Sequence, residues 1–126
     1  MNELLKAVKR GDQLTVRKLI ASHAALNQKD SQGWTPLFMA AGKGDAHVVQ
    51  LLIDAGVDVN DGDETGFTAL FSAVISGHVK VVRLLLGAGA SAMITVQGAP
   101  LTKWVMMKGA RREQLLQMLR QAGAKE

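Results

Sequence analysis

The chain has 126 residues, 48% of them apolar, which is the length of one domain with enough apolar residues to fill a core. It has no cysteine, which excludes disulfides and thiolate chemistry. The sequence shows no signal peptide pattern, and no apolar run approaches the roughly 18 residues of a membrane span. We therefore expect a cytoplasmic protein. The net charge of +4 is unevenly distributed along the chain. Residues 64–126 have 8 Lys and Arg against 3 Asp and Glu, a net charge of +5, whereas residues 1–63 have 7 Lys and Arg against 8 Asp and Glu, a net charge of −1.

A short unit recurs along the chain at a spacing of 33 residues. A partial copy at 4–12 aligns with residues 37–45, and residues 33–38 (GWTPLF) return as 66–71 (GFTALF). The second half of the unit is found at 48–56, 81–89 and, more loosely, 115–123. A fixed period of this size indicates one supersecondary unit stacked on itself. We therefore expect a single domain, 1–126, of four units at about 1–29, 30–62, 63–95 and 96–126.

Each unit is predicted to contain two helices and a hairpin. In the second unit, the apolar residues of 37–41 have the i, i+3, i+4 spacing of a helix, and Pro36 suits its first turn. A second apolar run follows, which Asp45 is suited to cap at its start and Gly56 to end. Residues 57–65 combine β-branched residues with turn formers, as in a short extended hairpin.

These features resemble the ankyrin repeat family. The family opens its first helix with Gly-x-Thr-Pro-Leu-His and continues with Gly-His, Val-Val-x-Leu-Leu-Leu and Gly-Ala-Asp-Val-Asn. The chain matches these patterns at 33–37, 77–78, 81–86 and 56–60, and the resemblance extends over nearly its whole length. It implies an all-α fold, an ankyrin-repeat solenoid of helix-turn-helix units joined by short β-hairpin fingers.

The chain departs from the family pattern at a few positions. Phe38 and Phe71 replace the family's histidine, so we expect apolar packing there instead of a hydrogen bond to imidazole. His23 stands where a helix-ending glycine is usual and is expected to adopt the left-handed conformation. The last unit is one residue shorter near 98–101, and Trp104 stands where the two preceding units have alanine. We interpret the first and last units as caps with a polar outer face.

Candidate catalytic residues are few. The three histidines, His23, His47 and His78, stand at unrelated places of the repeat, and no Ser or Thr has partners for a triad. Residues 61–66 (DGDETG) resemble the start of a calcium loop, but Ser72 stands where a bidentate Glu is required. We therefore expect no enzyme activity, no cofactor and no metal.

The basic second half could attract phosphates through a cluster of four side chains, Lys103, Lys108, Arg111 and Arg112. Aromatic residues that would stack on bases are missing, since Trp104 is the one aromatic after Phe71. We interpret this half as a solvated surface, with a docking patch for an acidic partner as the alternative. We expect a monomer that binds neither nucleic acid nor membrane.

The resemblance implies that the concave face, formed by finger tips and the exposed side of each first helix, binds a partner protein. The positions of this chain that match the family's variable, surface-facing positions are the candidate binding residues. They are Ser31, Gln32, Trp34, Gly42 and Lys43 in the second unit, Glu64, Thr65, Phe67, Ile75 and Ser76 in the third, and the helix positions Met106 and Met107 in the fourth.

Trp34 and Phe67 occupy the same position of successive units and are the expected aromatic anchors. The alternative is that each ring only packs on a neighbouring finger. Ile75 and the two methionines would add an adaptable apolar edge. The apolar third finger, 91–96, either folds back on the last unit or is itself a contact loop.

We therefore predict a protein–protein interaction module that binds its partner through the concave groove and the fingers. The alternative is a dedicated inhibitor or regulatory subunit of a single enzyme such as a kinase. This alternative rests on residues 105–111 (VMMKGAR), which are similar to a segment of ankyrin-type inhibitors of cyclin-dependent kinases.

Overall fold

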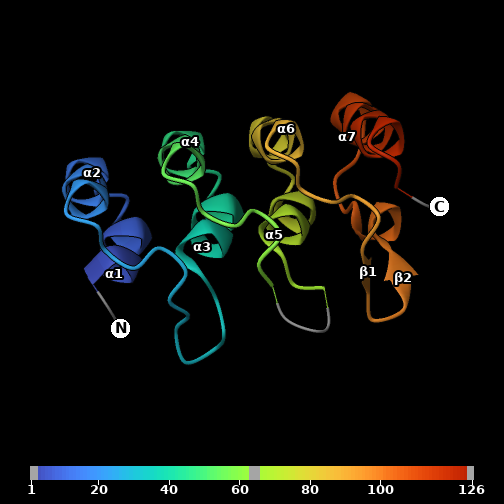
Figure 1. Cartoon of the computed structure of the whole chain (residues 1–126). Coiled ribbons are helices and arrows are strands. Elements are labelled where there is room, and N and C mark those ends of the chain that lie inside the picture. Colours follow the sequence, from blue (N-terminus) through green and yellow to red (C-terminus); the bar gives the residue numbers. More distant parts are fainter. Residues whose placement is uncertain (1–2, 63–65, 125–126) are drawn as a thin grey trace.

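Helices in pairs follow one another along the chain and form two rows, from which loops project to one side (Figure 1). The computed structural model describes residues 3–62 and 66–124. The inner row, next to the loops, contains α1 (Glu3–Arg10), α3 (Pro36–Lys43), α5 (Ala69–Ser76) and the short 3-10 helix η1 (Leu101–Trp104). The outer row contains α2 (Gln13–Ala21), α4 (Ala46–Asp54), α6 (Val79–Gly87) and α7 (Ala110–Gln121). The predicted all-α solenoid is confirmed.

Side chains just before the helices fix where they begin. The hydroxyls of Thr35 and Thr68 accept hydrogen bonds from the N–H three residues on, at 3.1 and 3.3 Å, at the start of α3 and α5. Asp45 Oδ1 accepts from the N–H of Val48 at 3.2 Å, which confirms the predicted N-cap of α4. Each bond satisfies a backbone donor that has no partner within the helix. Local sequence therefore sets the helix starts before any packing is considered.

Helix α2 has Val16 as its one fully buried residue, so the residues at its two ends contribute a larger share of its stability. The Thr15 hydroxyl donates to Asp12 Oδ2 at 2.6 Å and the Thr15 N–H donates to Oδ1 at 3.1 Å, and these bonds lower the pKa of Asp12 below its usual range. The charged cap is therefore kept as the pH falls, until the lowered pKa is reached. At the other end His23 has a φ of 63°, which confirms the expected left-handed residue.

The inner helices pack closely because the residues between them are small. Ala7, Ala40, Ala41 and Ala73 have no solvent-exposed surface. A Cβ at Gly42 of α3 would lie 2.6 Å from Ser72 Oγ of α5, so a larger residue there would displace the Ser72 hydroxyl from its place against α3. This stripe of alanine and glycine sets the distance between successive units.

Hydrogen bonds to helix carbonyls link α3 to the unit that follows it. The Ser72 hydroxyl donates to the carbonyl of Phe38 at 3.2 Å. His78 Nε2 lies 3.0 Å from the carbonyl of Gly42 in the last turn of α3. The carbonyls at the end of a helix have no partner within it, so His78 satisfies one of them from the next unit.

The last unit differs from the expected helix pair. Met106 and Met107 were expected at helix positions, and this is wrong, since η1 ends at Trp104 and neither methionine lies in a helix. The Trp104 ring makes an edge contact with the Phe71 ring at 5.4 Å. The chain makes one 3-10 turn at Leu101–Trp104, and Arg112 Nη1 then donates to the Val105 carbonyl at 2.6 Å.

The loops differ from one another in their internal structure. The third finger contains an antiparallel pair, β1 (Thr95–Val96) and β2 (Ala99–Pro100), joined by a turn with positive φ at Gln97 and Gly98. Its inward residues Ala92 and Val96 are buried, whereas Met93 is 62% exposed. In the described part of the predicted hairpin 57–65, residues 57–62, the chain forms turns and no strand.

The second and third fingers are joined through Asn60. Its side-chain amide donates to the Gly89 carbonyl at 3.1 Å, and its oxygen accepts from the Ser91 N–H at 2.8 Å. Gly66 lies so close to the third finger that a Cβ there would overlap the Thr95 carbonyl oxygen. The second and third fingers therefore lie in close contact, linked by the Asn60 side chain and by the approach of Gly66 to Thr95.

We expect Gly66→Ala to destabilise the protein more than Gly33→Ala. Both glycines have a positive φ, 90° and 82°, but a Cβ at Gly33 meets nothing within 4 Å. Gly33→Ala should cost about 1 to 2 kcal/mol of unfolding free energy from the left-handed backbone alone. Gly66→Ala should cost about 2 kcal/mol more, because the third finger must move. Urea unfolding followed by circular dichroism measures both, and equal losses would contradict the close finger contact.

Candidate functional site

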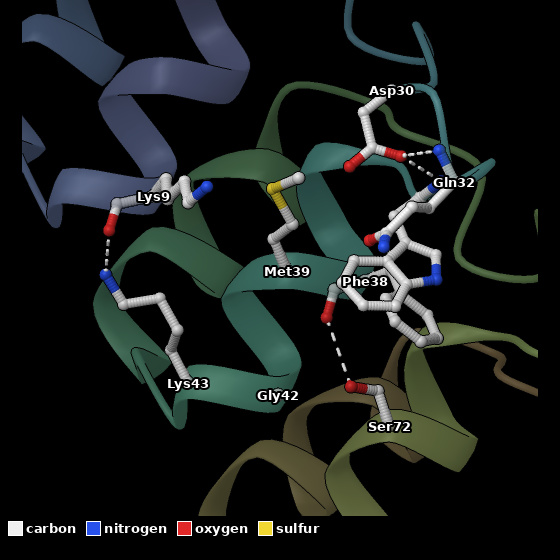
Figure 2. Close-up of a pocket in the computed structure, with 9 residues that line it drawn as sticks. Lys9, Asp30, Gln32, Phe38, Met39, Gly42, Lys43 and Ser72 are labelled. Atoms are coloured by element: carbon white, nitrogen blue, oxygen red, sulfur yellow. Dashed lines mark hydrogen bonds between the residues drawn. The ribbon is translucent and has the colours of Figure 1, made fainter. Parts of the chain in front are cut away.

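A groove of about 320 Å³ lies between the first finger, which is the loop 22–35 between α2 and α3, and the inner helices (Figure 2). Residues from three successive units meet there, since the first finger and α3 line most of it while α1 and α5 each contribute one residue. The lining residues are Lys9, Asp30, Gln32, Trp34, Phe38, Met39, Gly42, Lys43 and Ser72. The structure thus brings together four residues that the sequence marked as variable surface positions, Gln32, Trp34, Gly42 and Lys43.

The floor of the groove is aromatic and apolar. The Trp34 ring lies on the Phe38 ring with centroids 5.2 Å apart and 30° between the planes. Thr35 places the two rings together, because it ends the finger and caps α3 between them. Met39 continues the apolar surface along α3. The floor is already formed in the free chain.

The equivalent ring pair in the next unit has the same arrangement. Phe67 stacks on Phe71 with centroids 5.0 Å apart and 14° between the planes. Trp34 and Phe67 are both partly buried, and each packs on the phenylalanine that replaces the family's histidine. The expected apolar packing of Phe38 and Phe71 is confirmed, while the role of Trp34 and Phe67 as binding anchors stays a prediction.

Two lysines form one end of the groove (Figure 2). Lys43 Nζ donates to the carbonyl of Val8 at 3.3 Å and to that of Lys9, which are in the last turn of α1. The Val8 carbonyl also accepts from the Gly11 N–H at 3.1 Å, so the cation adds a second donor there, binds the Lys9 carbonyl, and compensates the negative end of the helix dipole. Lys9 has no hydrogen-bond or ion-pair partner for its ammonium among the described residues.

A single carboxylate fixes the finger at the other end. Asp30 Oδ1 accepts hydrogen bonds from the N–H groups of Gln32 at 2.8 Å and Trp34 at 3.0 Å. These bonds hold the turn that carries both residues. Figure 2 shows Asp30 and Gln32 on one side of Met39, and Lys9 and Lys43 on the other.

The groove is open because of a position that differs in every unit. Lys9, Gly42, Ile75 and Met106 are equivalent residues of the four units by alignment of their inner segments. Gly42 has no side chain to fill the space above α3, whereas Ile75 is 40% exposed and Met106 is 64% exposed. The same side of the inner row therefore offers a hollow at the second unit and exposed apolar side chains at the third and fourth.

The other candidate residues are placed separately from the groove. Ser31 and Ser76 are exposed, and Met107 is partly buried against Gly77, where a Cβ would lie 3.3 Å from its Cε atom. Glu64 and Thr65 lie outside the described residues. Ser31, Ser76 and Met107 are not part of the groove lining.

Sequence reasoning missed Lys9, Asp30, Met39 and Ser72. Met39 precedes Lys43 by four residues, so helical spacing could have placed it on the same face. Extending the variable position of Gly42 back by 33 residues would have found Lys9. No sequence pattern marks Asp30 or Ser72 as a groove residue. The turn of the first finger places Asp30 there, and the packing of α5 on α3 places Ser72 there.

The described residues contain no group of three or more His, Asp or Glu side chains that could hold a metal ion. Each of the three histidines has a different structural role. His78 contacts α3, His47 Nε2 lies 3.1 Å from Arg17 Nη2, and His23 follows the end of α2. Within the described residues, no helix has the length and apolar character needed to cross a membrane.

A family model described as ankyrin repeats (3 copies) matches residues 4–96. The match includes the groove and the first three helix pairs, and the chain from residue 97 onward lies outside it. No curated protein matches the chain.

We expect Lys43→Met to lower the free energy of unfolding by about 1 kcal/mol, because the carbonyls at the end of α1 lose a charged donor while the aliphatic stem is kept. Lys80→Met, on the exposed surface of α6, is the matched control with the same change of charge and should have little effect. Urea unfolding measures both variants. Equal stabilities of the two would contradict the proposed role of Lys43 at the helix end.

Proposed function

The chain belongs to the ankyrin repeat family, whose members are generally protein–protein interaction modules, and we propose that it binds a partner protein through the groove at its second unit. The observation that carries the proposal is the groove itself. Its floor of stacked aromatic rings is formed from one finger and one helix, and its rim carries charged side chains from neighbouring elements.

The aromatic floor suits an interface anchor. Trp34 is partly buried on Phe38, so its ring is held in place while part of its surface stays accessible. An interface that is already ordered loses little side-chain entropy on binding. Tryptophan and other aromatic residues also contribute a large share of the binding free energy at protein interfaces.

The exposed apolar residues beyond the groove extend the proposed surface. Ile75 and Met106 occupy the positions equivalent to Gly42 in the third and fourth units and are exposed to solvent. Methionine is flexible and polarisable, so it adapts to partner surfaces of different shape. A partner longer than the groove could therefore contact several units.

We propose a binding role without catalysis. The charged side chains of the groove are Lys9, Asp30 and Lys43. Asp30 is bonded to its own turn and Lys43 to α1, so each has a structural role, and no nucleophile with an adjacent base stands among them.

We expect Trp34→Ala combined with Phe67→Ala to weaken partner binding by about 30-fold, since truncating an aromatic anchor costs about 2 kcal/mol or more. The partner is first isolated by co-purification with the tagged chain from its native cell. Titration calorimetry and a thermal melt of each variant then separate affinity from stability.

The matched control is Gln50→Ala with Arg83→Ala, on α4 and α6 of the outer row, which should change affinity little. An aromatic variant that binds normally but melts far lower would contradict the proposal, because the rings would then serve packing alone. A single stoichiometric enzyme in the co-purification would favour the inhibitor alternative, whereas several unrelated proteins would favour an adaptor.

A further inference from the structure

We propose that the groove binds an extended segment of the partner in which an apolar side chain stands beside a carboxylate side chain. This inference rests on the proposed function and specifies the chemistry of the partner. It follows from three features of the groove: its apolar floor, the two cations at one end, and the carboxylate at the other.

The floor selects an apolar side chain. Trp34, Phe38 and Met39 form its surface, and Gly42 leaves the space above α3 open. A Cβ at Gly42 would displace the Ser72 hydroxyl, which donates to the Phe38 carbonyl, so glycine at this position keeps both the hollow and this link between α3 and α5. Binding an apolar side chain there removes apolar surface of both partners from water.

The lysine end selects a carboxylate beside that side chain. The Lys9 ammonium is without a bonded partner among the residues 3–62 and 66–124. Lys43 Nζ uses two of its three donors on the carbonyls of α1, which leaves one for a ligand. Arg10, which is also near the end of α1, lies 3.7 Å from the carboxylate of Asp12. The cation available without competition is therefore Lys9, and a carboxylate would accept charge-assisted hydrogen bonds from both lysines.

The opposite end disfavours a second carboxylate. The Asp30 carboxylate lies beside Gln32, on the far side of Met39 from the lysines (Figure 2). A like charge placed next to it would be repelled, which distinguishes the two ends of a bound segment. The groove is therefore expected to accept the acidic residue on the lysine side only, so the segment binds in one direction.

The test uses a library of randomised twelve-residue peptides displayed on phage and selected on the immobilised full chain. Selected sequences should contain Asp or Glu next to Phe, Leu, Ile or Met. The strongest binder, made as a fluorescent peptide, should bind Lys9→Gln about threefold more weakly and Lys9→Glu about tenfold more weakly than the native chain. A copy of the peptide with its acid changed to the amide should lose affinity for the native chain but not for Lys9→Glu.

Lys80→Glu, which makes the same charge change on α6, is the control and should bind the peptide within about twofold of the native chain. Selected peptides without an acidic residue, peptides that bind Lys9→Glu unchanged, or a selection without enrichment would each overturn the inference. The proposed function would survive any of these results if the isolated partner still depended on Trp34 and Phe67. Loss of that dependence would instead contradict the proposed function.

Discussion

The close approach of the inner helices is the constraint on which the rest of the structure depends. Alanine at Ala40, Ala41 and Ala73 and glycine at Gly42 let α3 and α5 approach until Ser72 bonds to a carbonyl of α3. Buried small residues give a fixed stacking distance, because neither helix can move closer and separation would expose apolar surface. The same distance brings His78 to the end of α3 and places the second finger within bonding range of the third.

This constraint also produces the proposed binding surface. Glycine at Gly42, which faces the Ser72 hydroxyl, leaves a hollow above α3, and the adjacent units contribute Lys9 and Ser72 to its walls. Where packing permits a side chain at the equivalent position, as at Ile75 and Met106, the surface is raised and apolar. A single stacked scaffold can therefore present different chemistry at each unit while its backbone changes little.

The sequence predicted local features well because their causes are local. The cap at Asp45, the left-handed His23 and the helical fold depend on residues within a few positions of each other. It predicted the last unit poorly, because a short 3-10 helix stands in place of the expected helix and Trp104 contacts Phe71, a residue far away in the sequence. The groove was predicted in part, because Trp34 and Lys43 follow the repeat pattern whereas Asp30 and Ser72 enter through turn geometry and stacking.

We propose that a partner binds at the second unit, between the first finger and α3. The most direct test is an NMR titration of the isotope-labelled chain with the isolated partner, followed through backbone amides and the tryptophan indoles. We expect the largest shift changes at Trp34, Met39, Gly42 and Lys43, with smaller changes toward Ile75. Changes confined to the outer helices α4 and α6, with the Trp34 indole signal unmoved, would contradict it.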